Sequence, residues 1–171
     1  MNTKFIPTPY KNILPNIAKN AYIAPNATIT GDTTIGELSN IWYNVVIRGD
    51  VAPIKIGKAT NIQDGSIIHV SRANHVQNKT KNEKAPTIIG NNVTVGHLSM
   101  LHACTIEDNA FIGMSSLIMD LAHIETEAML AAGTVITPGK IVKRGEISSG
   151  NLYRFMRKMT ESEINFTYIR K

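Results

Sequence analysis

Cysteine is almost absent from this sequence: Cys104 is the only one among 171 residues. A single cysteine excludes an intrachain disulfide and a thiolate metal cluster, and it is typical of proteins of the reducing cytoplasm. Aromatic residues are scarce at 6% and charged residues modest at 18%, but hydrophobic residues reach 43%. This composition supports a packed core and excludes extended disorder.

Long runs of one kind are missing as well. The net charge is +5, yet no basic run is longer than Lys143-Arg144, and no aromatic residues alternate with basic ones in the middle of the chain. Residues 1–20 carry three lysines and three prolines but no apolar segment. We therefore predict a cytoplasmic protein without a signal peptide or membrane span, and with no nucleic-acid or membrane partner.

What the sequence does contain is a period of six. An aliphatic residue, most often isoleucine, recurs every six residues from Ile23, with insertions after Ile47 and at 70–87 and one residue missing after Leu101. The fifth position of each six is small or apolar, the second is often glycine, and turn-forming residues are frequent at the third and fourth. The series is Ile23, Ile29, Ile35, Ile41, Ile47, Ile56, Ile62, Ile68, Ile89, Val95, Leu101, Ile106, Ile112, Ile118, Ile124, Leu130 and Ile136.

A period of six does not fit an amphipathic helix, which places apolar residues 3.6 apart. It fits short strands separated by turns, with three strands forming one coil of about eighteen residues and the aliphatic residues stacking inside. The sequence thus predicts an all-β fold, a left-handed parallel β-helix over residues 1–150. The left hand is assigned because known hexapeptide series have it.

The period ends before the C-terminus. Apolar residues from Leu152 through Phe155, Met156 and Met159 fit one helical face, and Thr160 followed by Glu163 indicates a capping box that starts a second helical segment. We predict that residues 151–171 form a C-terminal helical segment that packs on the β-helix.

Three of the five histidines lie within the repeats. His97 and His102 are predicted to be near neighbours on adjoining corners, and His69 lies on the coil before them. Neutral imidazole is the usual zinc ligand, and three of them leave a fourth position open for water, as in catalytic sites. A satisfied surface or core histidine is the competing interpretation for each.

Four segments carry a resemblance to a known family: Arg48-Gly49-Asp50, Asn61 to Gly65, Ile68-His69-Val70 and Gly96 to His102. Together they resemble the gamma class of carbonic anhydrases over about residues 15–160. The combination of Gln-Asp-Gly, a following histidine and a later histidine pair is specific, since other hexapeptide proteins share the repeat but not this set.

The resemblance implies a homotrimer with a metal ion between subunits, held by His69 and His102 of one chain and His97 of its neighbour. It further implies that Arg48, Asp50, Gln63 and Asp64 belong to the catalytic site and orient the ligating rings and the bound water. Arg48 and Asp64 could instead form only an ion pair between subunits. The implied reaction is the hydration of carbon dioxide to bicarbonate by a zinc-bound hydroxide; iron, cobalt or nickel would also accept three histidines.

Two departures from the family bear on activity. Val51-Ala52-Pro53 stands where the best-known active members have a glutamate, and Ser71-Arg72 follows His69-Val70 where they have an acidic residue. These acids are thought to remove the proton from the bound water, so weak activity is expected here. His75 is a possible substitute, although a solvated loop residue is the simpler interpretation.

Two other functions stay open at this point. Many hexapeptide proteins are acyltransferases, which use one catalytic histidine and no metal. A metal-binding trimer without catalysis would carry the same three histidines.

Overall fold

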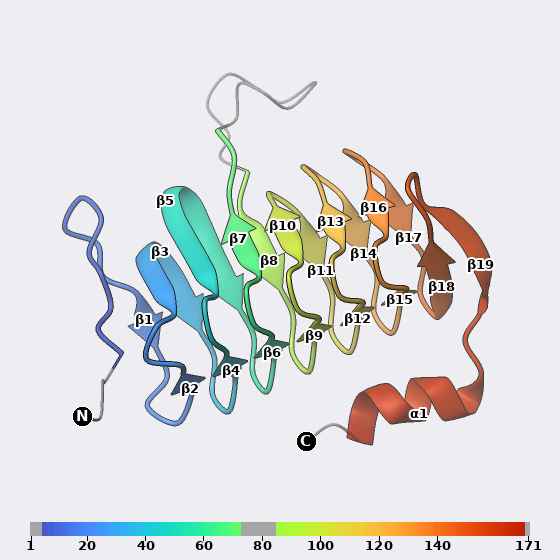
Figure 1. Ribbon diagram of the computed structural model, residues 1–171, viewed down its shortest axis with the longest axis horizontal. Helices are drawn as coiled ribbons and strands as arrows, with labels where there is room; N and C mark the ends of the chain where they lie inside the picture. Colours follow the sequence, from blue (N-terminus) through green and yellow to red (C-terminus); the bar gives the residue numbers. More distant parts are fainter. Residues whose placement is uncertain (1–4, 73–84, 170–171) are drawn as a thin grey trace.

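The structure, a computed structural model, describes residues 5–72 and 85–169. It is a left-handed parallel β-helix whose coils lie side by side, with a short helix after the last coil (Figure 1), which confirms the predicted fold class. None of the helices in the described part is long and apolar enough to cross a membrane.

The strands form three flat faces. The long strands β3 and β5 bend from the first face onto the second, so these two faces share one eleven-stranded sheet, and the third face is an eight-stranded sheet. On the first face lie the leading parts of β3 (Thr28–Ile35) and β5 (Val46–Ile56), then β7 (Ile67–His69), β10 (Met100–His102), β13 (Leu117–Ile118) and β16 (Val135–Ile136).

The other two faces are built in the same way. The second has β1 (Asn16–Ile17), the trailing parts of β3 and β5, β8 (Thr87–Ile89), β11 (Thr105–Ile106), β14 (His123–Ile124) and β17 (Ile141–Val142). The third has β2 (Tyr22–Ile23), β4 (Asn40–Ile41), β6 (Asn61–Ile62), β9 (Thr94–Val95), β12 (Phe111–Ile112), β15 (Met129–Leu130) and β18 (Glu146–Ser149).

The predicted aliphatic series fills the interior. From Ile29 to Ile136 every member of the series is 3% exposed or less, and the small fifth-position residues are buried at the corners between faces. In each short strand the sixth residue points outward and the first residue of the next six points inward, because side chains alternate along a strand. Each buried isoleucine contributes about 1.5–3 kcal/mol of hydrophobic stabilisation.

The corners are tight because the fourth residue of the six adopts a left-handed conformation. Asn44, Asn92 and Asn109 have φ between 54° and 60°, as asparagine does readily, but Leu38 and Leu98 do so too with φ of 58°. At the second position the coils approach closely: a Cβ added to Gly57 would lie 2.6 Å from the backbone of Gly90 on the next coil. Glycine there is therefore a packing requirement.

The C-terminal end departs from prediction. Residues predicted to begin a helix at Leu152 form a turn and the strand β19 (Arg154–Lys158), which pairs antiparallel with β18. The helix α1 (Glu161–Ile169) begins at the predicted capping box, where Thr160 N–H donates to Glu163 Oε2 (2.8 Å) and Glu163 N–H donates to Thr160 Oγ1 (3.2 Å). The prediction of a helix at 152–159 was wrong. The last coil leaves a free sheet edge, and hydrogen bonding to that edge outweighs the local helical spacing of apolar residues.

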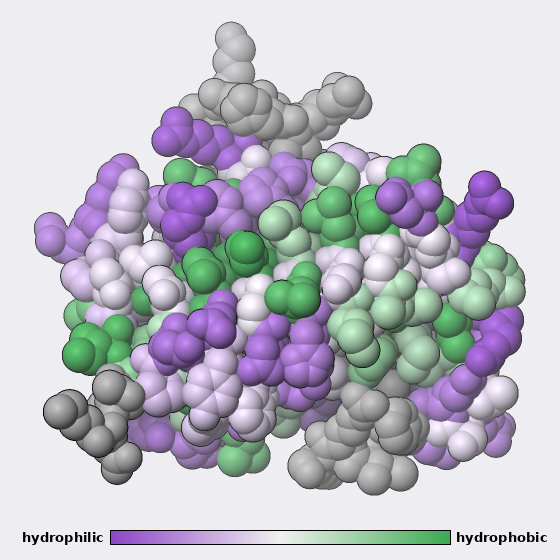
Figure 2. Space-filling model, in the orientation of Figure 1, coloured by the Kyte–Doolittle hydropathy of each residue, from purple (hydrophilic) through white to green (hydrophobic). Residues whose placement is uncertain are grey.

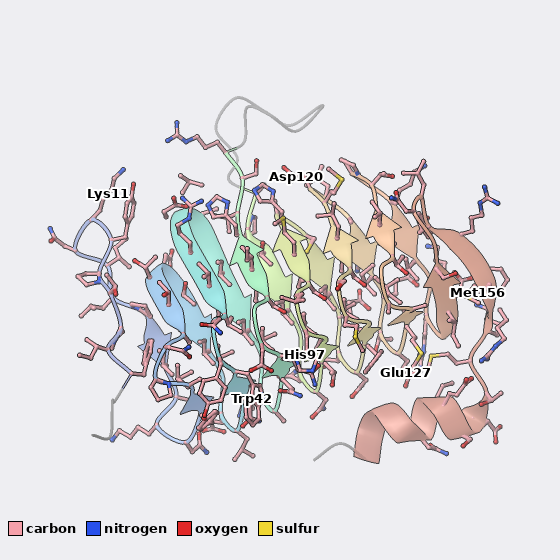
Figure 3. All side chains as sticks on the ribbon, viewed as in Figure 1. Lys11, Trp42, His97, Asp120, Glu127 and Met156 are labelled. Carbon is pink, nitrogen blue, oxygen red and sulfur yellow. The ribbon has the colours of Figure 1, made fainter. Side chains whose placement is uncertain are left out.

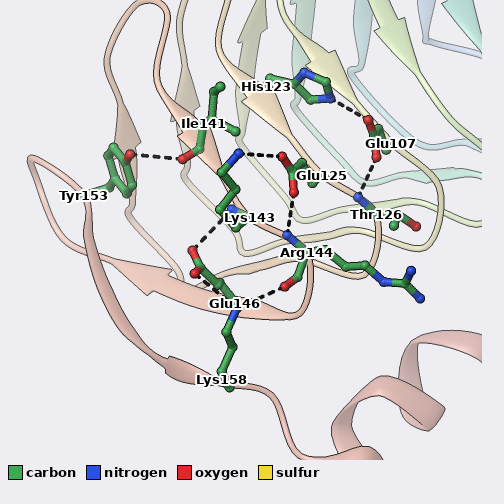
Figure 4. A network of polar contacts seen from close by, with 10 residues as sticks. All are labelled: Glu107, His123, Glu125, Thr126, Ile141, Lys143, Arg144, Glu146, Tyr153 and Lys158. Carbon is green, nitrogen blue, oxygen red and sulfur yellow. Dashed lines mark hydrogen bonds and ion pairs between the residues drawn. The ribbon is translucent and has the colours of Figure 1, made fainter.

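Charged side chains join the final coils to this strand. The side-chain ammonium of Lys143 and the backbone N–H of Arg144 both donate to the carboxylate of Glu125 on the preceding coil. Lys158 of β19 contacts Glu146 at 3.2 Å (Figure 4). The network connects three successive layers of the fold at its C-terminal end.

Candidate metal centre

Asp50 and His69 meet at the corner between the first and second faces, which we call the His69 edge. His69 Nε2 lies 2.9 Å from Asp50 Oδ1, and the other carboxylate oxygen accepts a 2.6 Å hydrogen bond from Arg48 Nη1. Arg48 and Asp50 lie on β5 where it bends over this edge, one coil before His69 at the end of β7. The insertion after Ile47 therefore places the carboxylate of Asp50 beside the ring of His69.

The second histidine of this edge follows from strand register. β7 and β10 pair in parallel with His69 aligned to His102, and the two rings face each other with His69 Nδ1 3.2 Å from His102 Nε2. The remaining nitrogen of His102, Nδ1, lies 2.5 Å from Asp120 Oδ1. Asp50, His69, His102 and Asp120 thus form one continuous polar row across four coils.

The pKa values at this edge reflect burial and charge together. Burial works to raise the pKa of Asp50, but the hydrogen bond from His69 and the charge of Arg48 outweigh it, so the pKa is lowered. The pKa of His69 is lowered, first by burial and also by Arg48 and His102, against the opposing effect of Asp50. An ionised aspartate beside a neutral imidazole is the arrangement that supports metal ligation.

His97 lies at a different corner, between the third and first faces, which we call the His97 edge. Its Nδ1 lies 2.9 Å from Asp64 Oδ2, and Asp64 Oδ1 accepts a 3.2 Å hydrogen bond from Tyr43 N–H. Gln63 precedes Asp64 at the same edge. Both members of the His97–Asp64 pair are well exposed, at 49% and 41% of their side chains.

The structure therefore divides the predicted site residues into two groups. Arg48, Asp50, His69 and His102 come together at the His69 edge, and Gln63, Asp64 and His97 lie at the His97 edge, across the first face. Figure 3 shows this separation for Asp120, at the His69 edge, and His97. His97 and His102 do stand on adjoining corners, but they do not meet within the chain.

Among residues 5–72 and 85–169, no three His, Cys, Asp or Glu side chains of one chain form a group that could hold a metal ion. His75, the possible proton acceptor, lies outside the described residues. Asp120 was missed from the sequence because it occupies a turn position where aspartate is common. Its only signal was spacing: it follows His102 by eighteen residues, one more than the 17-residue spacing at which β10 and β13 pair.

The donors at the His69 edge fit a divalent metal ion. Two imidazole nitrogens about 2.0–2.1 Å from a tetrahedral zinc ion are about 3.3–3.4 Å apart. The facing nitrogens of His69 and His102 are 3.2 Å apart, and the opposite nitrogen of each ring is held by a carboxylate. Two ligands are half of the set that a zinc ion needs, so a further donor must come from outside this edge.

Fold and repeat define the chain as a hexapeptide-repeat β-helix protein. The family model "Bacterial transferase hexapeptide (six repeats)" matches residues 15–49, and "Hexapeptide repeat of succinyl-transferase" matches residues 104–138. A solved hexapeptide transferase family protein from Anaplasma phagocytophilum is 44% identical with a TM-score of 0.86, covering 95% of this chain and 89% of that one.

The curated relatives narrow the class. A carbonic anhydrase of Geobacillus kaustophilus (strain HTA426) is 45% identical over 156 residues, which are 91% of this chain and 80% of that protein. Gamma carbonic anhydrase 1, mitochondrial, of Arabidopsis thaliana is 44% identical over 152 residues, which are 89% of this chain and 54% of that protein. The chain belongs to the gamma carbonic anhydrase family. It spans about half the length of the Arabidopsis relatives it matches.

Proposed function

We propose that the chain assembles into a homotrimer that binds a divalent metal ion between subunits and catalyses the reversible hydration of carbon dioxide to bicarbonate. The observation that carries the proposal is the division of the histidines between two edges of one face. His69 and His102 supply two facing nitrogens at one edge, and His97 lies at the other. A cyclic trimer brings opposite edges of the same face together, because each subunit contacts its two neighbours through different surfaces.

The surface between these edges supports this mode of assembly. The outward residues of β7 and β10, Ile67 and Met100, are 38% and 43% exposed, and Leu98 and Met114 are exposed along the His97 edge. Hydrophobic side chains gather across the middle of this face (Figure 2). The outward residues of the neighbouring strands, Val46, Leu117 and Val135, continue the apolar row. A contiguous apolar face of this kind favours burial against another subunit.

Zinc is the proposed metal because neutral imidazole suits it, although iron, cobalt and nickel also accept three histidines. When bound, such an ion acidifies a water ligand and so supplies a nucleophile near neutral pH, for which carbonic anhydrases are the standard example. His69, His102 and the neighbour's copy of His97 would hold the ion. The lone cysteine, buried and unpaired at position 104, fits the proposed cytoplasmic location.

The polar residues of both edges have separate tasks. Asp50 accepts a hydrogen bond from His69 and Asp64 lies 2.9 Å from His97, and a carboxylate so placed can orient each ring. Arg48 is half exposed beside Asp50, where its guanidinium can attract the bicarbonate anion, and the amide of Gln63 can orient water at the His97 edge. Arg48 and Asp64 already have partners within their own chain, so an ion pair between subunits is not their only available role.

Hydration of carbon dioxide releases a proton that must leave the site. Val51 packs partly against the core, and Arg72 is exposed and basic, so neither replaces the missing acids. Transfer to buffer then limits turnover, and weak activity that depends on buffer follows.

Three measurements test the proposal. Sedimentation at micromolar concentration should give a trimer, and metal analysis of freshly purified protein should give about one ion per subunit. A stopped-flow hydration assay of the same sample should exceed the rate of the chelator-treated control and rise with pH. A monomer, or a metal-loaded trimer with no hydration above the uncatalysed rate, would contradict the proposal; the latter result would leave a metal-binding trimer without catalysis.

Acyl transfer is a second candidate, since the solved relative from Anaplasma phagocytophilum is described as a hexapeptide transferase family protein. Consumption of acetyl coenzyme A by the metal-free protein in the presence of amine acceptors would favour it. The carbonic anhydrase proposal predicts no such consumption.

A further inference from the structure

Every histidine of the proposed site has a carboxylate partner on a neighbouring coil. Two of these carboxylates lie in the segments that carry the family resemblance, but the third lies outside all of them, in the turn between β13 and β14. The three pairs are Asp50 with His69, Asp64 with His97, and Asp120 with His102.

The backbone fixes Asp120 firmly at the His69 edge. Its carbonyl oxygen accepts a 2.9 Å hydrogen bond from Gly139 N–H on the following coil, and the N–H of Leu121 donates to Ala103 O on the preceding coil at 2.7 Å. The side chain of Asp120, labelled in Figure 3, is about three-quarters buried, and its Oδ1 lies 2.5 Å from His102 Nδ1. The backbone of the turn is therefore held by the coils on both sides, with the Asp120 carboxylate directed at His102.

This contact decides which nitrogen of His102 carries the proton. An imidazole with one N–H has one lone pair, and a carboxylate oxygen that accepts a hydrogen bond at Nδ1 favours the form with the proton there. Nε2 then carries the lone pair, and Nε2 is the atom that faces His69 Nδ1 at 3.2 Å. Without the carboxylate, the alternative form with a proton on Nε2 competes, and that form cannot bind a metal through Nε2.

We propose that Asp120 is a positioning residue that holds His102 in its metal-binding form. This inference rests on the proposed function, because it assigns Asp120 a task at the same metal site. Removal of such a partner typically weakens metal binding about 10- to 100-fold.

A purely structural role must be separated from this one, since the pair also connects two coils. The chain offers a matched control in His123 and Glu107, whose Nε2–Oε1 distance is 2.7 Å (Figure 4). These residues also lie on neighbouring coils, at β14 and just after β11, on the second face. If Asp120 only connects coils, removing either carboxylate should have similar consequences.

The experiment compares Asp120→Ala, Asp120→Asn and Glu107→Ala in the full-length trimer. The measured quantities are the Kd for Zn²⁺, from competition with a chromophoric chelator, the visible spectrum of the Co²⁺-loaded protein, and the Tm of the metal-free protein. We expect Asp120→Ala to raise the Kd about 10- to 100-fold. Asp120→Asn keeps an acceptor oxygen and should recover part of the loss, and Glu107→Ala should leave the Kd and the spectrum unchanged.

Wild-type Kd and Co²⁺ spectrum in both Asp120 variants would overturn the assignment while leaving the proposed function intact. An equal rise in Kd in Glu107→Ala would also overturn it, because the effect would then come from loosening the coils. Failure of the wild-type protein to bind Zn²⁺ would instead overturn the proposed function and this assignment with it.

Discussion

Mixing two variants that each lack one histidine should restore metal binding that neither variant has alone. In His97→Ala each chain keeps His69 and His102 but lacks the donor of the His97 edge. In His102→Ala each chain keeps His97 but lacks the complete pair at the His69 edge. A mixed trimer then contains some interfaces at which the intact edge of one variant meets the intact edge of the other. For random mixing in equal amounts, about one interface in four is complete.

The size of the effect follows from the site geometry. Zinc binding worth about 10–16 kcal/mol in a four-ligand site averages about 2.5–4 kcal/mol per ligand, so losing one ligand should weaken binding about 10²- to 10³-fold. The fold itself should persist in His97→Ala, because the His97–Asp64 pair is about half exposed and such pairs contribute about 0–1 kcal/mol. Near-wild-type thermal unfolding of metal-free His97→Ala would verify this.

The assay is metal content after the two variants, carrying different tags, are unfolded together, refolded and purified through both tags. A mixture of His69→Ala and His102→Ala is the matched control, because both changes fall on the same edge and no interface can be complete. Two outcomes would refute the division of the site between subunits. One is equal metal content in the two mixtures. The other is no metal in the mixture of His97→Ala and His102→Ala although mixed trimers form.

Four further outcomes are expected. Ile112→Ala should lower the free energy of unfolding by about 2–5 kcal/mol in urea titrations, because Ile112 is fully buried. Burial raises the pKa of Cys104 to about 12, so a thiol reagent at pH 8 should label it only after unfolding. The hydrogen bond from Arg157, with those at Thr160, lowers the pKa of Glu163 from 4.5 to about 2. Its stabilisation of α1 should be complete above pH 4.5 and disappear as the pH falls toward 2, and Glu163→Gln should remove that change in the circular dichroism signal of the helix. Imidazole buffer should raise kcat for hydration and leave kcat/KM little changed, and Arg72→Glu should reduce that dependence.

The coils could be predicted from the sequence because one rule repeats along the chain. Each predicted aliphatic residue from Ile29 to Ile136 is buried. Side chains alternate along a strand, so a residue that recurs every six positions points to the same side of each strand, which here is the interior. Leu38 and Leu98 could not be assigned to left-handed corners from residue type, because leucine rarely adopts that conformation. Their conformation is imposed by the coils on either side.

The sequence named residues of the candidate site, and the resemblance implied how the three histidines divide between chains, but the contacts between these residues could not be predicted. The row from Asp50 to Asp120 depends on parallel register, which aligns His69 with His102 although 33 residues separate them. The 70–87 insertion obscures that register in the sequence, and a single turn aspartate gives no local sign that it contacts a histidine. Strand β19 was missed for a related reason: its five residues are all exposed, so it shows no alternation between buried and exposed positions and exists because β18 has an edge to pair with.

Strand β19 also limits the end-to-end association of molecules. A β-helix ends in an unpaired edge onto which a parallel coil of another molecule could add, and such addition has no natural stopping point. β19 occupies the edge of the third face in the opposite direction and presents Arg154, Arg157 and Lys158 outward. Stacking end to end into fibres is therefore disfavoured at this sheet edge, whereas the proposed sideways association into a closed ring would have a defined number of members.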